Sequence, residues 1–158
     1  MESVSEMQTP SGAHVWLVLM KAYQAIAAAA AEDLSESHLG ESDFRVLEVL
    51  LHKGALAVNV IGPKVNLTPG SISTAVDRLH ERGLVSRCED LADRRVRMVD
   101  LTPQGRHLIE AVYEKHAAKL EKIADVLSHE ERLQLEHLLK KIGYSGNAQK
   151  QIESRTII

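Results

Sequence analysis

The chain has 158 residues, enough for one domain or for a compact core with a dimerising extension, and its 44% hydrophobic content permits a packed core. Aromatic residues make up only 3% of it, which argues against an aromatic stacking platform for RNA or single-stranded DNA. The formal net charge of -3 excludes a uniformly basic nucleic-acid coat, so any binding to DNA has to come from a local basic patch.

The cysteine content and the apolar runs constrain where the protein resides. Cys88 is the single cysteine, which excludes an internal disulfide framework and cysteine-rich zinc sites. No apolar run approaches the roughly 20 residues that span a bilayer. The first residues also lack the basic start of a signal peptide. We therefore expect a cytoplasmic protein without a membrane partner.

Residues 1–34 are expected to comprise a flexible start and a dimerisation helix. From Gly12 onward, apolar side chains recur at spacings of three and four residues: Trp16, Leu19, Met20, Tyr23, Ile26 and Ala30. The alanine run at 25–32 permits close approach of another helix. A second helix is predicted to begin at Ser42, a suitable N-cap, and to stop at Gly54.

The segment 55–85 has the pattern of a helix–turn–helix. A short helix fits residues 58–65, and the turn NLTPGS then offers Thr68 as N-cap and Pro69 as the first helical residue. Gly83 supplies the C-terminal stop of the second helix. The inward face of that helix carries apolar residues at i, i+3, i+4 and i+7: Ile72, Ala75, Val76 and Leu79.

The outer face of the same helix carries small hydrogen-bonding residues suited to the major groove of DNA, which is about 12 Å wide and admits one α-helix. The helix N-terminus offers free N–H groups to a phosphate, and Gly70 lets the backbone come close. Arg78 and Arg82 lie further along and could reach the DNA backbone or a guanine edge. Taken alone, this face also fits an ordinary amphipathic helix with a solvated surface. The candidate DNA contacts are Thr68, Gly70, Ser71, Ser73, Thr74 and Arg78.

A β-hairpin is predicted next, with strands GLVSR and VRMVDLT on either side of an arginine-rich tip. Residues 86–97 hold four basic and three acidic side chains. Such a wing can lay guanidinium groups in the adjacent minor groove, where the negative potential is strong. Asp93 can pair with one arginine and hold the shape of the tip. The candidate wing contacts are Asp93, Arg94, Arg95 and Arg97.

Two C-terminal dimerisation helices are predicted over residues 103–143. Thr102 is the N-cap of the first, which begins at Pro103 and runs to about Leu127. His116 lies in the apolar stripe of this helix, where it is interpreted as a satisfied core or interface histidine.

A capping box formed by Ser128 and Glu131 opens the last helix. Leucines follow at helical spacing, and Gly143 is expected to end the helix. Residues 144–158 are mostly polar, so a flexible tail is expected there.

These elements indicate a mainly α fold with a small β-hairpin wing (α+β), in which a winged helix–turn–helix at residues 42–102 is flanked by N- and C-terminal dimerisation helices. Residues 42–110 strongly resemble the MarR family of winged helix–turn–helix transcriptional regulators. The resemblance rests on VDRLHERGLVSR at the end of the recognition helix, the Asp-x-Arg wing tip of Asp93 and Arg95, and LTPQG at the start of the next helix. The stretch CEDLADRR departs from the proline-containing wing approach of many members.

The resemblance implies a homodimer that binds double-stranded DNA at a pseudo-palindromic operator, represses transcription and releases DNA on a small-molecule or redox signal. The residues independently favour a dimer, because the flanking helices carry more apolar surface than a small winged domain can cover. A twofold axis would set the two recognition helices about 34 Å apart.

The resemblance also implies an effector pocket between the winged domain and the dimer helices. The same residues fit an ordinary core at helical spacing, which is the alternative interpretation for most of them. The candidates for the lining are Trp16, Met20, Tyr23, Phe44 and Tyr113.

Other interpretations stay open. Cys88 is a candidate redox switch beside Arg87, although an ordinary strand cysteine is the preferred interpretation. A metal-responsive (zinc) regulator of the same fold is a second alternative, but the histidine and glutamate spacing matches no strong metal signature, so neither a metal site nor a cofactor is assigned. The residues considered for it are His38, His107, Glu110 and Glu114.

A winged helix can also serve protein–protein contact alone, which would leave binding insensitive to salt and to the loss of Arg95. An enzyme is not expected, because the sequence contains no P-loop, nucleophile elbow, dinucleotide fingerprint or convincing acid–base pair. No catalytic residue is therefore assigned.

Overall fold

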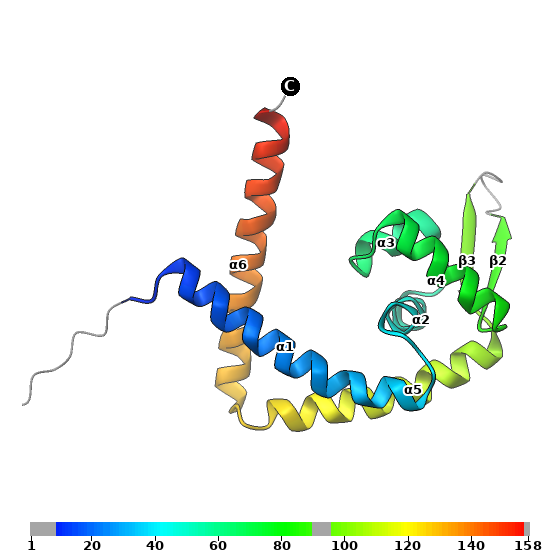
Figure 1. The fold of residues 1–158 in the computed structure, drawn as a ribbon, viewed down its shortest axis with the longest axis horizontal. Coiled ribbons are helices and arrows are strands. Elements are labelled where there is room, and N and C mark those ends of the chain that lie inside the picture. The colour runs from blue at the N-terminus through cyan, green and yellow to red at the C-terminus, as the bar shows by residue number, and fades with distance from the viewer. Residues whose placement is uncertain (1–8, 90–95, 157–158) are drawn as a thin grey trace, which may run out of the picture. The chain divides into compact units, whose positions relative to one another are not determined.

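The computed structural model describes residues 9–89 and 96–156 of the chain. The chain forms two compact units, residues 1–119 and 120–158. The helices are α1 (Gly12–Glu36), α2 (Glu41–Lys53), α3 (Val58–Lys64), α4 (Pro69–Glu81), α5 (Pro103–Ala124) and α6 (His129–Thr156). The strands are β1 (Leu56–Ala57), β2 (Val85–Glu89) and β3 (Arg97–Leu101) (Figure 1).

The sheet contains the predicted hairpin and one further strand. β2 and β3 pair in an antiparallel register that sets Glu89 opposite Arg97. β1 pairs with the other edge of β3, with Leu56 opposite Val99, so the strand order is β1-β3-β2. A strand of two residues has no periodic signal of its own, which is why the sequence did not predict it. The predicted fold class, mainly α with a small β wing, is confirmed.

One hydrophobic core joins α2, α4, α5 and the sheet. The face of α4 that the apolar spacing predicted to point inward is buried. Its residues are Ile72, Ala75, Val76 and Leu79. Among the other members of the core are Leu47, Leu50, Val85, Val99 and Ile109. Apolar burial of this kind contributes about 25 cal/mol per Å² of surface removed from water. The core therefore holds α4 by its apolar face and leaves the opposite face exposed.

Threonine followed by proline opens both α4 and α5, as predicted. The Thr68 hydroxyl accepts the amide of Ser71 at 3.2 Å. The Thr102 hydroxyl accepts the amide of Gly105 at 3.0 Å and donates to the Gly83 carbonyl at 2.7 Å. These bonds satisfy amides that have no partner inside the helix, and so they fix where each helix begins.

The predicted N-cap of α2 at Ser42 is wrong. α2 begins at Glu41, and its N-cap is Gly40, which makes no side-chain capping bond. The Ser42 hydroxyl instead accepts a hydrogen bond from Arg78 of α4 at 3.2 Å. A tertiary contact has thus replaced the local capping role that the residue type favours.

The last helix begins as predicted but runs further than predicted. The Ser128 amide donates to the Glu131 carboxylate at 2.8 Å, and the Glu131 amide donates to the Ser128 hydroxyl at 3.3 Å, which is a capping box. The predicted end at Gly143 is wrong, because α6 continues through it to Thr156. Most of the expected flexible tail is therefore helical. One glycine costs a helix interior about 1 kcal/mol, too little to end it by itself.

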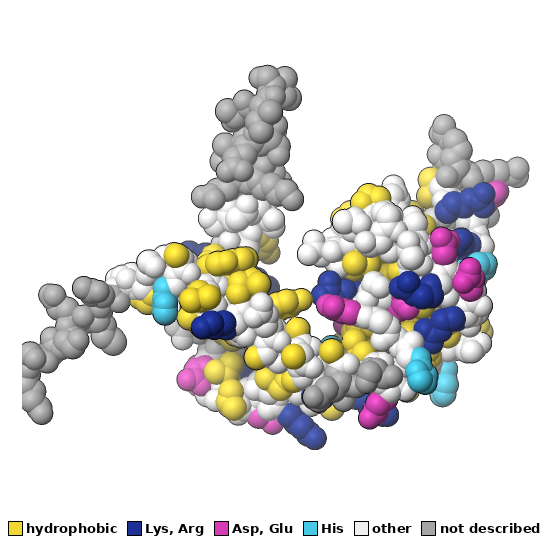
Figure 2. All heavy atoms as spheres, viewed as in Figure 1, with side chains coloured by type: hydrophobic (Ala, Val, Ile, Leu, Met, Phe, Trp, Pro, Cys, Tyr) yellow, Lys and Arg dark blue, Asp and Glu magenta, His cyan; other side chains and the backbone are white. Residues whose placement is uncertain are grey.

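Apolar side chains are exposed along α1, and Figure 2 shows a group of hydrophobic side chains on the visible side of this helix. The segment Gly12–Ala31 is long and apolar enough to cross a membrane by length and composition, with a mean hydropathy of 1.2. The expectation that no apolar run approaches this length is therefore corrected. The core helix of a soluble protein and a signal sequence meet the same criterion, so the segment is only a weak indication of a membrane span.

Candidate nucleic-acid interface

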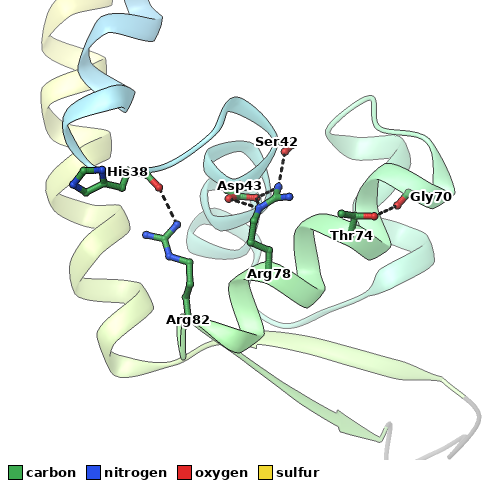
Figure 3. Close-up of polar contacts among 7 residues, drawn as sticks. All are labelled: His38, Ser42, Asp43, Gly70, Thr74, Arg78 and Arg82. Atoms are coloured by element: carbon green, nitrogen blue, oxygen red, sulfur yellow. Dashed lines mark hydrogen bonds and ion pairs between the residues drawn. The ribbon is translucent and has the colours of Figure 1, made fainter.

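The outer face of α4 presents hydroxyl groups that already donate hydrogen bonds to backbone carbonyls of the same helix. The Ser73 hydroxyl donates to the Pro69 carbonyl at 3.0 Å. The Thr74 hydroxyl donates to the Gly70 carbonyl at 3.0 Å, as Figure 3 shows. Each of these exposed oxygens retains lone pairs. The face can therefore accept hydrogen bonds from the amino groups that adenine and cytosine show in the major groove.

The first turn of α4 is open to close approach. A Cβ at Gly70 would meet no other part of the described chain within 4 Å, so there is open space beside this glycine. Ser71 is exposed beside it, and its hydroxyl lies 2.9 Å from that of Thr68. A helix N-terminus with uncovered backbone is suited to a phosphate group.

The base of the wing lies against α4. Arg87 of β2 forms an ion pair with Asp77 of α4, a connection that the sequence did not predict. Arg97 begins β3 with an exposed side chain, 3.8 Å from the carboxylate of Glu89. Figure 2 shows Lys and Arg side chains among acidic ones over the region of α4 and β2. The other predicted wing contacts, Asp93, Arg94 and Arg95, lie outside the described residues.

Two hollows bring the recognition helix and the wing base to one surface. The larger, of about 500 Å³, lies between α3, the start of α4 and β3, and the second, of about 480 Å³, lies between α4 and the wing strands. Ser73 and Arg97 line both. Two sets of residues that the sequence assigned separately therefore meet on one surface. The larger hollow is lined by Val58, Asn59, Gly62, Pro63, Leu67, Pro69, Ile72, Ser73, Val96 and Arg97.

Arg78 is directed at α2 rather than at the surface formed by the hydroxyls. Its Nε donates to the two carboxylate oxygens of Asp43 at 2.9 and 3.1 Å, and its Nη2 donates to Ser42 at 3.2 Å (Figure 3). The hydrogen bond with Asp43, opposed by partial desolvation, raises the pKa of Arg78 above its ordinary value. The guanidinium therefore stays charged; its Nε and Nη2 donate to residues of α2, and the side chain as a whole is 45% exposed.

Asp43 is the site residue that the sequence reasoning missed. Its side chain is only 2% exposed and shares the buried face of α2 with Val46, Leu47 and Leu50. The signal was present as a carboxylate on an apolar stripe at helical spacing. Such a residue calls for a cationic partner, because an unpaired buried charge is costly.

The predicted effector residues fall into two groups. Trp16 and Tyr23 are exposed on α1, at 61% and 53%, and Met20 is partly buried there. Phe44 belongs to the core, and Tyr113 packs against that core. Whether the five residues line one pocket stays a prediction.

His116, predicted as a core or interface histidine, lies beside this group. Its ring is 4.7 Å from that of Phe44, between ring centroids. Its Nδ1 is buried and has no hydrogen-bond partner among the described residues. The ring is therefore packed as predicted, but its polar atom is not satisfied within a single chain.

The redox and metal alternatives gain no support from the geometry. Cys88 is exposed in β2, and the neighbouring Arg87 already pairs with Asp77. Among the residues that the structure describes, no three His, Cys, Asp or Glu side chains are grouped so that they could hold a metal ion.

Comparisons with known proteins agree with this geometry. The model of the MarR family matches residues 39–96. The HTH-type transcriptional regulator MhqR of Bacillus subtilis (strain 168) is 33% identical over 138 residues, which cover 87% of this chain and 95% of MhqR. The HTH-type transcriptional repressor MdtR of the same bacterium is 26% identical over 84% of this chain and 85% of MdtR.

A solved structure extends the likeness to the whole fold. BpsR of Bordetella bronchiseptica superposes with a TM-score of 0.73 and 29% sequence identity, over 82% of this chain and 98% of BpsR. DNA binding by BpsR is regulated by 6-hydroxynicotinic acid.

Proposed function

Because the chain belongs to the MarR family of transcriptional regulators, we propose that it is a homodimeric repressor that binds a pseudo-palindromic operator and is released by a small-molecule signal. The chain is a transcriptional regulator and not an enzyme, as the sequence predicted. The observation that carries the finer proposal is the surface on which Ser73 of α4 and Arg97 of the wing line the same two hollows.

We assign the reading of bases to the hydroxyls of Ser71, Ser73 and Thr74 in the major groove. Their exposure and their free lone pairs support this role. Thr68 and Gly70 would receive a phosphate at the helix N-terminus. The wing would enter the adjacent minor groove, where Arg97 joins the sequence-assigned Asp93, Arg94 and Arg95.

The dimer proposal rests on apolar side chains that a single chain leaves exposed. They line α1, as described above, and α6, where the exposed residues are Leu133, Leu135, Leu138, Leu139 and Ile142. Large exposed apolar patches mark association surfaces. Pairing two chains about a twofold axis would set the recognition helices about 34 Å apart, one helical turn of DNA. A cytoplasmic location follows from this role.

The signal that we propose is a small aromatic acid, the chemical class of the compound that regulates BpsR. Trp16, Met20, Tyr23, Phe44 and Tyr113 are the residues proposed to receive it. A ligand that favours the non-binding conformer would change the half-site spacing, with a coupling free energy of roughly 1 to 3 kcal/mol. Oxidation of Cys88 and binding of zinc are the two alternative signals, and the DNA-binding assay described next tests both.

The test is binding of the purified protein to a labelled DNA fragment that flanks its own gene, followed by fluorescence anisotropy. We expect two chains per site, at least 100-fold preference over a shuffled fragment, and weaker binding by Arg95→Ala. Release by 6-hydroxynicotinic acid, by peroxide or by zinc would identify the signal class. Equal affinity for both fragments, unaffected by salt or by Arg95→Ala, would instead support a module for protein–protein contact.

A further inference from the structure

We propose that Arg78 and Arg82 are positioning residues, which fasten the recognition helix α4 to the junction between α1 and α2, with Asp43 as the buried anchor. The inference deepens the proposed function and rests on it, since it names how the DNA-reading helix is held. It gives Arg78 a role inside the protein in place of the DNA contact that its position on the helix suggested.

The first attachment is the pair between Asp43 and Arg78. Among the residues whose side chains the structure describes, Asp43 is the only buried charged one. Arg78 meets both of its oxygens through Nε, and its Nη2 also contacts Oδ1 and the Ser42 hydroxyl (Figure 3). Arginine suits such a site because its planar fork presents several donors at once. Four contacts from one guanidinium therefore fix the middle of α4 against the start of α2.

The second attachment lies four residues after Arg78, at Arg82, the C-cap residue of α4. Nη1 of Arg82 donates to the His38 carbonyl at 2.9 Å (Figure 3). His38 has a left-handed backbone with φ of 56°, and lies in the short connection between α1 and α2. Residues four apart share one face of a helix, so Arg78 of α4 and Arg82, the C-cap residue of α4, reach toward the same junction.

The junction itself is seated in the core, so it can serve as an anchor. Leu34 and Leu39 on either side of His38 are buried, and the Ser37 hydroxyl donates to the Leu34 carbonyl at 2.7 Å. α1 enters this junction directly, and its exposed apolar face is the surface proposed for the dimer. In addition to apolar packing, α4 is therefore tied to the connection after α1 through Arg82 and to the first turn of α2 through Arg78.

Contact with DNA through Nε or Nη2 would require Arg78 to leave Asp43, although the Arg78 side chain is 45% exposed in the pair. That movement would strand a carboxylate that is 2% exposed, and an unpaired buried charge is strongly destabilising. The two roles for Arg78 make opposite predictions for Asp43→Asn. If Arg78 contacts DNA, freeing it and removing a nearby negative charge leaves binding unchanged or tighter. If Arg78 positions α4, the same change weakens binding.

The experiment compares the dissociation constant of the operator complex for wild type, Asp43→Asn and Arg78→Gln, after thermal unfolding shows which variants are folded. We expect about tenfold weaker binding for each, with an unchanged slope of log K against log salt. The double variant is expected to bind no more weakly than the worse single variant, because both changes break one connection. Glu41→Gln is the matched control, since it breaks an exposed pair with Arg45 on the same helix.

A second measurement does not depend on DNA and covers variants that do not fold well. Hydrogen exchange of the free protein is compared for wild type, Arg78→Lys and Arg82→Gln. We expect faster exchange of α4 amides and unchanged exchange in α6. Failure of the wild type to bind DNA would contradict the proposed function, whereas the hydrogen-exchange result would still show whether Arg78 and Arg82 hold α4 in place. Any of three results would overturn the inference. The first is unchanged hydrogen exchange of α4 in both variants, and the second is unchanged or tighter DNA binding by folded Asp43→Asn. The third is a slope of log K against log salt that is lowered by about 0.9 in Arg78→Gln.

Discussion

Gly105 in the first turn of α5 is the residue at which the smallest change has the largest expected effect. A Cβ there would lie 1.8 Å from the carbonyl oxygen of Leu84 and 2.8 Å from its carbonyl carbon. The obstacle is backbone, which cannot rotate away as a flexible side chain can. The close approach of α5 to the start of the wing therefore depends on a missing side chain.

We predict that Gly105→Ala lowers the free energy of unfolding by roughly 1 to 3 kcal/mol, or prevents folding, because it overpacks this contact. Urea unfolding followed by circular dichroism measures the change. Gly143→Ala is the matched control within a helix, since a Cβ at Gly143 meets nothing within 4 Å. It should raise stability by about 0.5 to 1 kcal/mol. Equal stability of the two variants would show that the contact at Leu84 is absent.

The beginning of helix α4 is fixed by its N-cap residue, Thr68. We predict that Thr68→Ala lowers the free energy of unfolding by about 1 kcal/mol, because the Ser71 amide loses its partner. Ser73→Ala removes a hydroxyl of the same helix that, among the described residues, is shown bonding to the Pro69 carbonyl and does not cap the helix. Its effect should stay within about 0.5 kcal/mol. The same urea titration compares both, and an equal loss in the two variants would mean that Thr68 does not determine where α4 begins.

Several elements could be predicted from the sequence because the residues that determine them lie close together in the chain. Thr68 and Thr102 sit directly before prolines, and the apolar spacing from Ile72 to Leu79 is helical, so sequence neighbours alone define these features. The DNA-facing side of α4 was assigned for the same reason. Its assignment as a DNA contact remains a prediction, but its exposure is a property of the fold.

Features that depend on distant residues were not predictable in the same way. β1 exists because β3 lies beside it, and Ser42 is drawn from its capping role by Arg78, a residue of another helix. The pair between the buried Asp43 and Arg78 joins residues 35 apart in the chain. α6 passes through Gly143 because a single unfavourable residue is outweighed by the helix on both sides.

At the scale of the whole molecule, the exposed leucines of α6 carry the expectation of a dimer. Leu138 is 50% exposed in a single chain. We predict that Leu138→Glu shifts the protein from dimer to monomer, because it places a charge in the apolar contact. Size-exclusion chromatography with light scattering measures the mass. Val126→Glu, at a residue between α5 and α6 that is 84% exposed, should leave the dimer intact. If the Leu138→Glu protein remained dimeric, α6 would not be part of the dimer interface.

The central claim is that α4 and the wing base form one DNA-binding face, and a fluorescence-anisotropy titration over salt concentration tests it most directly. Wild type is compared with Arg97→Gln and with Arg106→Gln, a control on the exposed side of α5. An arginine in the minor groove also neutralises phosphate charge, so its loss should lower the slope of log K against log salt by about 0.9 in Arg97→Gln, with Arg106→Gln unchanged. A wild-type affinity that does not depend on salt, or an equal slope in all three proteins, would contradict the claim.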